Sequence, residues 1–493
     1  MKSNPDGRLS NNSIWWLFGT AILSMIIYLG ASGVYFHFGF PLDDAWIHQT
    51  YARNLALHGE WSFIPGQPTG GSTSPLWTTF LGIGFLLKLS PLPWTFFLGG
   101  ITLFCLSVLG ELVIRRMKSS YHPKFPWVGV ALALEWHLVW AAYSGMETIL
   151  FALLVTAALG MIILGSSKYL GLGILIGLSV WVRPEGITLL GPAVIVILLT
   201  RTTWSKRVGW LINLGVGFGS LFALYLLFNL TISGSPLPNT FYAKQAEYAD
   251  ILKVPFMTRF VGEVLPVLAG MGTLLLPGVV LTLVSAIRNK AWGILSAAIW
   301  FLGFLGIYAL RLPVTYQYGR YVMPAMPVFF LLGLAGLVGI IPARGPNWRW
   351  VLATAWKLAS AGVLVAFWVI GAVHYARDVA FIESEMVATA RWVSINIPKD
   401  ELVATHDIGA MGYFGGHDLV DLAGLVSPEV IPFLRDETRL ADYLNDRRVT
   451  YLITFPDWYQ QLTFGLTPVY TTGAPFSRSS GGTNMTVYRW LSP

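Results

Sequence analysis

Charged residues are scarce in this chain. Aspartate, glutamate, lysine and arginine make up 12% of its 493 residues, whereas a soluble protein has about 25%. The chain is 55% hydrophobic, its mean hydropathy is +0.61, and several apolar runs reach the roughly 20 residues that a helix needs to cross a bilayer. The sequence therefore predicts an α-helical polytopic membrane protein.

Cysteine is almost absent, and so are the common cofactor motifs. Cys105 is the single cysteine, which excludes an intrachain disulfide. No HExxH, CxxC or Walker loop occurs, and no glycine-rich dinucleotide fingerprint follows a predicted strand. A soluble nucleotide-binding enzyme is therefore unsupported. The net charge of +7 does not point to nucleic acid, because much of the basic excess lies in short loops between apolar runs.

Basic clusters in short loops mark the cytoplasmic side of a membrane protein. The clusters are Arg115–Arg116–Lys118, Arg201 with Lys206 and Arg207, Arg288 with Lys290, and Arg344 with Arg349. About eleven spans are predicted, at 14–38, 92–114, 127–145, 148–165, 168–182, 187–200, 209–231, 262–287, 292–311, 321–341 and 351–374. The first follows a polar tail with Lys2 and Arg8 and is interpreted as a retained signal-anchor. These features predict a multi-pass protein of the plasma (inner) membrane, with a cytoplasmic amino terminus and with everything after residue 375 outside.

Three short apolar stretches need separate treatment. Residues 75–89 are predicted to lie at the outer interface, because a crossing there would place the 115–118 loop on the same side as Asp43 and Asp44; the alternative is that they cross and another short segment does not. Residues 168–182 and 187–200 flank "VRPEG" and are predicted to rise, turn and descend. Irregular backbone at that depth is tolerated where it is buried or lines a wet cavity, so a cavity opening outward is expected.

Beyond residue 375 the composition changes. Short runs rich in β-branched and aromatic residues, such as "VTYLITF" and "MTVYRWL", predict strands, and stretches such as "ATARWVSINI" have helical spacing. We expect two parts: a transmembrane domain over 1–375, with a first outer loop at 39–91, and a small extracytoplasmic α/β domain over 376–493.

Two adjacent carboxylates, Asp43 and Asp44, open the first outer loop. One interpretation is structural, because Asp43 stands where an N-cap precedes a helix that Gly59 would end. The other is chemical. Adjacent carboxylates repel, which raises the proton affinity of one and suits it to act as a base, and they can also hold a divalent cation such as Mg²⁺ or Mn²⁺.

The other outer loops carry further polar residues. They are Glu147, Arg183 and Glu185, Asn239, Tyr242 and Lys244, and Tyr318, Arg320 and Tyr321. Each alone could be an ordinary interfacial anchor. Together, however, they converge with the aspartate pair on one membrane face, where basic side chains would suit a phosphate-bearing substrate. The histidines are less informative. His48 and His58 are expected on a helix surface, with the alternative that one of them faces the cavity, and His406 beside Asp407 is expected to make a structural hydrogen bond.

Seven motifs appear in an order typical of one family. They are "DDAWIHQTYARNLALHG", "PTGGSTSPLW", "SGMET", "VRPEG", "PLPNTFYAK", "GRYVMPAMP" and "DIGAMGYF…VDLAGL". This series, over roughly residues 14–425, resembles the polytopic GT-C glycosyltransferases, and most closely the bacterial arabinofuranosyltransferase-like branch that acts on cell-envelope glycans. The loop reads "DDAW", with tryptophan after the small residue where a tyrosine more often stands in that family, so the donor sugar stays open.

The resemblance implies a GT-C fold and a polyprenyl-phosphate-linked sugar donor that enters from the bilayer. Transfer to a glycan acceptor would occur on the outer face with inversion, using an aspartate of the first loop as base, with Asp44 slightly favoured over Asp43. By charge, Arg320 and Lys244 would stabilise the leaving phosphate. Arg183 and Glu147 would shape the sugar pocket, and the outer α/β domain would help to hold the acceptor.

Three other functions remain open from the sequence. One is a GT-C enzyme with a protein or lipid acceptor, the second is a transporter of lipid-linked sugars, and the third is a glycan-binding scaffold. Transporters place their sites near the bilayer midplane and often contain inverted repeats, whereas no repeat is detectable here and the polar motifs gather at one face. A glycosyltransferase is therefore the favoured prediction.

Overall fold

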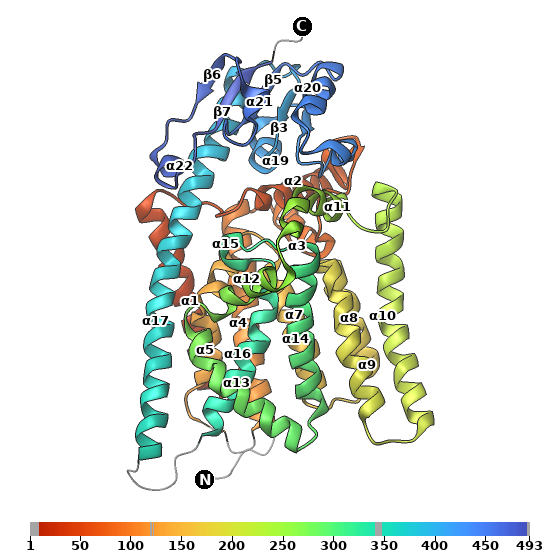
Figure 1. The fold of residues 1–493 in the computed structure, drawn as a ribbon, viewed down its shortest axis with the longest axis vertical. Helices are drawn as coiled ribbons and strands as arrows, with labels where there is room; N and C mark the ends of the chain where they lie inside the picture. The colour runs from red at the N-terminus through yellow and green to blue at the C-terminus, as the bar shows by residue number, and fades with distance from the viewer. Residues whose placement is uncertain (1–8, 119–120, 122, 341–347, 491–493) are drawn as a thin grey trace.

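The computed structural model describes residues 9–118, 121, 123–340 and 348–490. Its apolar helices stand side by side as a bundle, and a small domain that contains a β-sheet stacks on one end of this bundle (Figure 1). The amino end of α1 (Asn11–Tyr35) lies at the opposite end. Lys2, Arg8 and Arg344, named above for the orientation of the chain, lie outside the described residues.

Seven helical segments in the described ranges are long and apolar enough to cross a membrane. They are α1, α4 (Pro91–Met117), α10 (Trp204–Ser233), α13 (Met271–Arg288), α14 (Trp292–Arg311), Tyr316–Gly339 and Trp350–Asn396. The last two are composite, made of α15 (Tyr316–Gly319) with α16 (Met326–Gly339), and of α17 (Trp348–Ile382) with α18 (Ala388–Asn396). Shorter apolar helices complete the bundle: α3 (Pro75–Leu86), α7 (Thr148–Ile163), α8 (Tyr169–Val182) and α9 (Leu190–Leu199). The predicted polytopic helical architecture is confirmed.

The predicted span at 127–145 is not one helix. It divides into α5 (Trp127–Leu134) and α6 (Trp136–Tyr143). Glu135 between them has extended backbone angles, and its carboxylate accepts a hydrogen bond from the Leu138 N–H at 3.1 Å and contacts His137 Nδ1 at 2.8 Å. The side chain therefore caps a new helix where a continuous one was expected.

The predicted span at 262–287 is also interrupted. α12 (Phe256–Leu268) ends before Gly270, and α13 begins at Met271. Gly270 has φ +79° and ψ −130°, a conformation that residues with a Cβ rarely adopt. α12 consequently runs across the bundle, whereas α13 follows its long axis (Figure 1).

The short stretches behave differently from one another. α3 has 12 residues and is therefore about 18 Å long, less than the roughly 30 Å of the bilayer core; its place at the interface stays a prediction. After α8 the chain turns through the 3₁₀ segment η1 (Pro184–Leu189) into α9. At this turn Gly186 lies so close to α8 that an added Cβ would be 2.3 Å from Ser179 Oγ. This close approach requires a glycine at the predicted turn.

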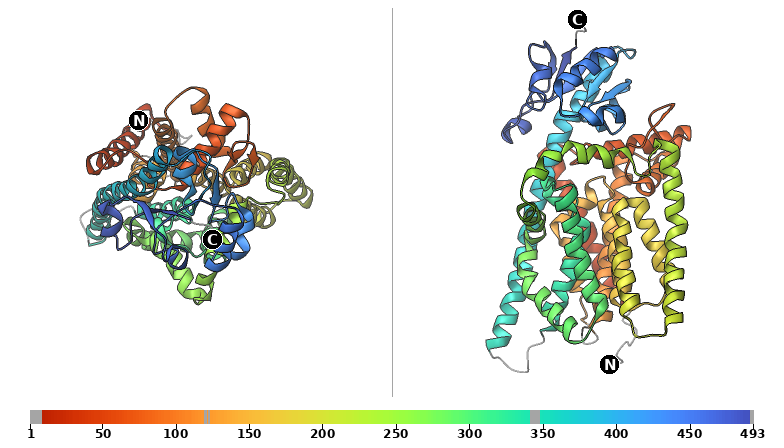
Figure 2. Two further views of the ribbon diagram at one scale, coloured as in Figure 1. Left: turned by 90° about the horizontal axis from the view of Figure 1, so that it is seen from above. Right: turned by 45° about the vertical axis from the view of Figure 1, so that its right-hand side comes forward.

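The end of the bundle that faces the sheet domain carries several short elements. They are α2 (Asp44–His58), the antiparallel pair β1 (Ser62–Ile64) and β2 (Gln67–Pro68), and α11 (Asn239–Glu247). They lie directly beneath the sheet domain, with α10 at the edge of the bundle (Figure 2). Of these elements, α2 and α11 carry Asp44 and Lys244, two of the predicted site residues.

The C-terminal domain contains a five-stranded mixed sheet with the order β4-β3-β5-β7-β6. The strands are β3 (Val403–Thr405), β4 (Leu419–Asp421), β5 (Tyr451–Thr454), β6 (Pro468–Thr471) and β7 (Thr486–Arg489). Strand β3 pairs in parallel with β4 and β5, and β7 pairs antiparallel with β5 and β6. The accompanying helices are α19 (Ile408–Ala410), α20 (Glu437–Asp446), α21 (Gln460–Thr463) and α22 (Pro475–Ser479). A small C-terminal α/β domain is therefore present, as predicted.

The bundle and this domain are joined by a continuous helical segment. α17 passes the proposed division after residue 375 and continues through a π-helical turn, η4 (Glu383–Val387), into α18. In this turn the buried carboxylate of Glu385 accepts hydrogen bonds from Asn484 Nδ2 and from the Met485 N–H, both at 2.8 Å, and also from the Thr472 hydroxyl. Glu385 thus ties the connecting helix to the edge of the sheet.

Replacing Glu385 with alanine should loosen the C-terminal domain, because three buried donors lose their charged acceptor. We expect the free energy of unfolding to fall by roughly 3 kcal/mol, measured as a lower thermal midpoint in detergent. Asp400→Ala, at an exposed site, is the control. Equal midpoints for the two variants would contradict this role for Glu385.

Candidate active site

A cavity of about 990 Å³ lies between the bundle and the C-terminal domain. Asp44, Lys244 and Arg320 line it from the bundle, and His406 and Asp407 line it from the C-terminal domain. The cavity therefore combines residues from both parts of the chain and carries charges of both signs.

The two adjacent aspartates have different partners. Asp43 stands before α2, but its side chain does not cap that helix. Instead, its carboxylate accepts hydrogen bonds from the N–H groups of Gly409 at 2.7 Å and Ala410 at 2.8 Å. The prediction that Asp43 caps its own helix is wrong, because these donors of α19 occupy both of its oxygens. Gly59 does end α2, with φ +71°.

Asp44 forms the central ion pair of the cavity. Its Oδ2 accepts a hydrogen bond from Arg320 Nη2 at 2.7 Å. The same nitrogen donates to the Tyr321 hydroxyl at 3.0 Å, and the rings of Tyr316 and Tyr321 lie 5.6 and 4.9 Å from the guanidinium carbon. Nε and Nη1 of Arg320 are buried and have no hydrogen-bond partner among the described residues. The N–H groups on these two nitrogens are donors of the kind that bind anionic oxygens.

The backbone before Arg320 is strained. Gln317 (φ 54°, ψ 44°) and Tyr318 (φ 61°, ψ 28°) are left-handed, and Gly319 follows with φ +72°. A residue with a Cβ pays on the order of 1–2 kcal/mol in this conformation. Such outliers persist where the surrounding structure over-determines them, often at ligand clamps, and here they fix the approach of Arg320 to Asp44.

Lys244 reaches the cavity from α11. This helix is anchored on the first outer loop, because the Asn239 N–H donates to the Gly70 carbonyl at 3.0 Å and the Thr240 hydroxyl donates to the Gly71 carbonyl at 2.7 Å. Lys244 Nζ lies 3.2 Å from a carboxylate oxygen of Glu247. Asn239 thus supports α11 through its main chain and is not itself in the lining of the cavity.

The charges separate the proton affinities of the three neighbouring aspartates. Burial acts to raise the pKa of Asp44, but Arg320 and Lys244 outweigh it, so this pKa is lowered. Burial and the nearby Asp407 raise the pKa of Asp43 against the opposing effect of its two N–H bonds. Burial also raises the pKa of Asp407, to about 6. At neutral pH, Asp44 is therefore a firmly ionised, weak base.

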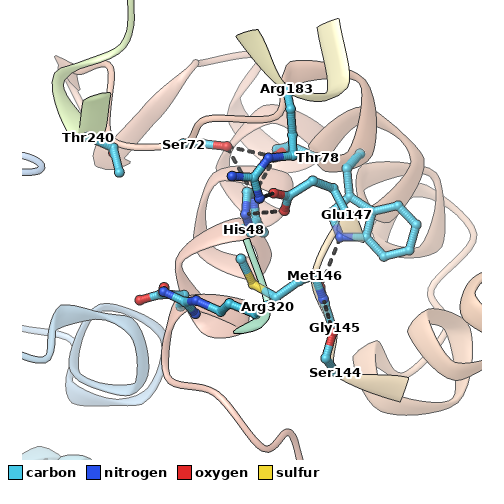
Figure 3. Close-up of polar contacts among 12 residues, drawn as sticks. His48, Ser72, Thr78, Ser144, Gly145, Met146, Glu147, Arg183, Thr240 and Arg320 are labelled. Atoms are coloured by element: carbon cyan, nitrogen blue, oxygen red, sulfur yellow. Dashed lines mark hydrogen bonds and ion pairs between the residues drawn. The ribbon is translucent and has the colours of Figure 1, made fainter. Parts of the chain in front are cut away.

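A second polar cluster lies beside the cavity, within the bundle (Figure 3). Glu147 pairs with Arg183 Nη1 at 3.1 Å and with His48 Nε2 at 3.3 Å. Arg183 also contacts both oxygens of Glu185 at 3.4 Å and donates to the Tyr308 hydroxyl at 3.1 Å. These residues are mostly buried and do not line the cavity, so the geometry makes them a support beneath it.

The predicted site residues therefore divide into groups. Asp43, Asp44, Lys244 and Arg320 line the cavity, and Glu147, Arg183, Glu185 and Tyr321 form or adjoin the support. Tyr321 connects the two groups, because its ring lies 5.5 Å from the Arg183 guanidinium carbon and its hydroxyl bonds Arg320. Tyr242 is brought to neither group; it is 37% exposed and packs on Phe241.

The structure corrects the expectation for one histidine and adds to it for another. His48 was expected on a helix surface, but it is 3% exposed, and its Nδ1 lies 3.0 Å from Ser72 Oγ and 3.2 Å from Thr78 Oγ1. His406 does make the expected hydrogen bond, to the Tyr459 hydroxyl at 2.8 Å, yet it also lines the cavity. The motif "PTGGSTS" contained a signal for the burial of His48, because the hydroxyl of its Ser72 contacts this histidine.

The aspartate pair does not fit a divalent cation as arranged. Both oxygens of Asp43 accept main-chain hydrogen bonds, and Asp44 is bound to Arg320. No group of three or more histidine, cysteine, aspartate or glutamate side chains is arranged to hold a metal in the described part of the chain.

Solved structures with a similar fold are membrane glycosyltransferases. ArnT from Cupriavidus metallidurans in the apo state aligns with a TM-score of 0.58 and 14% identity, over 98% of this chain and 99% of that one. The same protein bound to undecaprenyl phosphate gives 0.55 and 14%, over 96% and 98%. The Archaeoglobus fulgidus oligosaccharyltransferase in the apo form gives 0.58 and 12%, over 90% of this chain and 70% of that one. The chain has the GT-C fold.

One sequence family is matched within the chain. Residues 377–488 match DUF8728, a domain of unknown function, which corresponds to the end of α17 and the sheet domain. No curated protein sequence matches the chain. The GT-C fold is thus shown by structure, with a C-terminal domain that has no assigned role.

The cluster around Glu147 should contribute to the stability of the bundle. Glu147→Ala leaves the buried Arg183 without its closest carboxylate, and breaking a buried pair costs on the order of 3–5 kcal/mol. We expect a clearly lower thermal midpoint in detergent, with milder loss in Glu147→Gln, which can still accept a hydrogen bond. A Glu147→Ala protein of unchanged stability would show that the cluster is not a structural support.

Proposed function

We propose that this protein is a membrane glycosyltransferase that moves a sugar from a polyprenyl-phosphate-linked donor to a cell-envelope glycan. The observation that carries the proposal is the Asp44–Arg320 pair at 2.7 Å in a cavity at one end of the bundle. The same fold in ArnT, which is known bound to undecaprenyl phosphate, supports a donor of this class. Among possible sugars we favour a pentosyl group such as arabinofuranosyl, from the motif resemblance.

The donor phosphate is assigned to the cationic side of the cavity. Arg320 offers the unpartnered N–H groups of Nε and Nη1, and Lys244 lines the same cavity. A guanidinium and an ammonium together can bind a phosphate and neutralise the charge that develops as it leaves.

The lipid tail is assigned to an apolar groove between α1 and α4. This groove has a volume of about 630 Å³, and Met25, Phe38, Phe97 and Ile101 are among the side chains that line it. Phe38 at one end of the groove is close in sequence to Pro41, which lines the polar cavity. A polyprenyl chain in this groove would leave its phosphate near the cavity.

Transfer then proceeds by displacement with inversion. An acceptor hydroxyl attacks the anomeric carbon, polyprenyl phosphate leaves, and an aspartate of the cavity removes the hydroxyl proton. Of the predicted pair, Asp44 is the available residue, because both oxygens of Asp43 are engaged. Asp44 acts either as this base itself or as the partner that orients Arg320, and it is catalytic in both roles.

We place the cavity and the C-terminal domain on the outer face of the plasma (inner) membrane. The support is the arrangement of charge: the loop between α9 and α10 and the loop between α13 and α14, which carry basic clusters, lie at the end of the bundle opposite the sheet domain (Figure 1). Short loops rich in lysine and arginine face the cytoplasm.

Donor binding should depend on Arg320 and Lys244. Arg320→Gln and Lys244→Gln should each weaken the binding of polyprenyl phosphate to the purified protein by about tenfold or more, because a charged phosphate contact is lost. Lys253→Gln is the matched control, since Lys253 is 81% exposed and pairs with Asp250. Equal affinities of all three variants for polyprenyl phosphate would contradict the assignment of the donor phosphate to this cavity.

Transfer should depend on Asp44. Purified protein in detergent is given a panel of polyprenyl-phosphoryl sugars and a glycan acceptor, with and without Mg²⁺ or Mn²⁺. We expect Asp44→Asn to lower transfer by about 100-fold or more, because the variant loses the carboxylate that acts as the base or holds Arg320 at the donor phosphate. Undiminished transfer by Asp44→Asn would reject the catalytic role of Asp44. Movement of an unmodified lipid-linked sugar across the membrane of proteoliposomes, without transfer, would show that the protein is a transporter and not a glycosyltransferase.

A further inference from the structure

Among the described residues, one aspartate of the cavity has no hydrogen-bond or ion-pair partner for its carboxylate. Five aspartates line the cavity: Asp43, Asp44, Asp378, Asp407 and Asp457. Four of them accept hydrogen bonds from described residues. Asp43 accepts from Gly409 and Ala410, and Asp44 accepts from Arg320. Asp378 accepts from Trp140 and Tyr318, and Asp457 accepts from Thr483. The Asp407 carboxylate makes no hydrogen bond or ion pair with any residue that the structure describes. It is therefore the aspartate best placed to bind a substrate through both oxygens.

The first outer loop determines where Asp407 lies. Asp407 directly precedes α19, whose N–H groups at Gly409 and Ala410 are bound by Asp43. The contact is so close that a Cβ on Gly409 would lie 2.0 Å from the Asp43 carbonyl oxygen. Asp407 is thus held against the start of α2, where Asp44 faces the same cavity.

The charged surroundings give Asp407 and Asp44 different proton affinities. The groups that act on Asp407 are His406 on its own segment, Asp43 and Asp44 at the start of α2, and Lys244 and Glu247 on α11. Burial dominates and raises the pKa of Asp407 to about 6, whereas Arg320 and Lys244 keep the pKa of Asp44 low. A base is most effective when its pKa lies near the working pH, and two carboxylates with separated pKa values commonly divide catalytic roles.

We propose that Asp407, in the C-terminal domain, is a further catalytic residue that takes the proton of the acceptor hydroxyl, while Asp44 stays with Arg320 at the donor phosphate. This inference rests on the proposed glycosyl transfer and specifies its proton acceptor. As the acceptor oxygen bonds to the anomeric carbon, its proton passes to an Asp407 oxygen. The bond from the anomeric carbon to the phosphate oxygen breaks, and its electron pair leaves with polyprenyl phosphate. Asp407 then loses the proton to water.

The experiment compares wild type, Asp407→Asn, Asp407→Glu and Asp418→Asn in the transfer assay over a range of pH. Asp418 is an exposed aspartate of the same domain and serves as the matched control. The binding of polyprenyl phosphate and the thermal midpoint are measured on the same preparations, because a general base should affect neither.

We expect kcat of the wild type to fall as the pH drops below about 6, since a protonated carboxylate cannot accept a proton. Asp407→Asn should lower kcat by about 100-fold or more and abolish this pH limb, with phosphate affinity and thermal midpoint unchanged. Asp407→Glu should recover part of the rate, and Asp418→Asn should match wild type.

Other results would overturn the inference. If wild type transfers sugar and Asp407→Asn keeps a similar kcat and pH profile, Asp407 is not the base, although the proposed function stands. If Asp407→Asn loses phosphate binding and thermal stability together with kcat, its role is structural. If wild type transfers no sugar from any donor in the panel, the proposed function fails, and the assignment of Asp407 fails with it.

Discussion

The bond between Asp43 and the start of α19 is the contact on which the cavity depends. Two main-chain N–H groups of the C-terminal domain meet one carboxylate of the first outer loop, at 2.7 and 2.8 Å. This contact fixes His406 and Asp407, directly before α19, against the start of α2. The neighbouring Asp44 is thereby free to face the cavity and pair with Arg320. Two adjacent carboxylates thus serve different purposes, one in assembly and one in the site.

The buried cluster beneath the cavity supports the same ion pair from the other side. Arg183 and Arg320 both lie near the ring of Tyr321, at 5.5 and 4.9 Å, and Tyr308 stacks on that ring at 5.7 Å. The Glu147–Arg183 contact therefore restrains Tyr321, and Tyr321 restrains Arg320. Together with the left-handed residues before Arg320, this packing leaves the guanidinium little freedom to move, which is how binding geometry is pre-organised.

The sequence predicts the bundle well, because membrane crossing requires apolar length, and length can be read from hydropathy. It does not predict the interruptions at Glu135 and Gly270. Each interruption depends on the local backbone geometry of one or two residues, which a hydropathy value averaged over many residues does not report. The predicted topology alone was enough to place the loops that carry Asp44, Lys244 and Arg320 on the same side of the bundle. The partners of Asp43 could not, because they are main-chain atoms 366 and 367 residues away. His48 was misplaced for a related reason, since its burial depends on hydroxyls of a separate loop.

The nature of the Asp43 contact has a consequence for how related chains can diverge. Its partners are main-chain groups, so no change of side chain at residues 409 and 410 can compensate for the loss of the carboxylate. Gly409 has no room for a Cβ beside the Asp43 carbonyl, which leaves that position no alternative residue. In an alignment of chains that share this interface, we therefore expect aspartate at position 43 and glycine at position 409 to be invariant, with no covariation between the two positions.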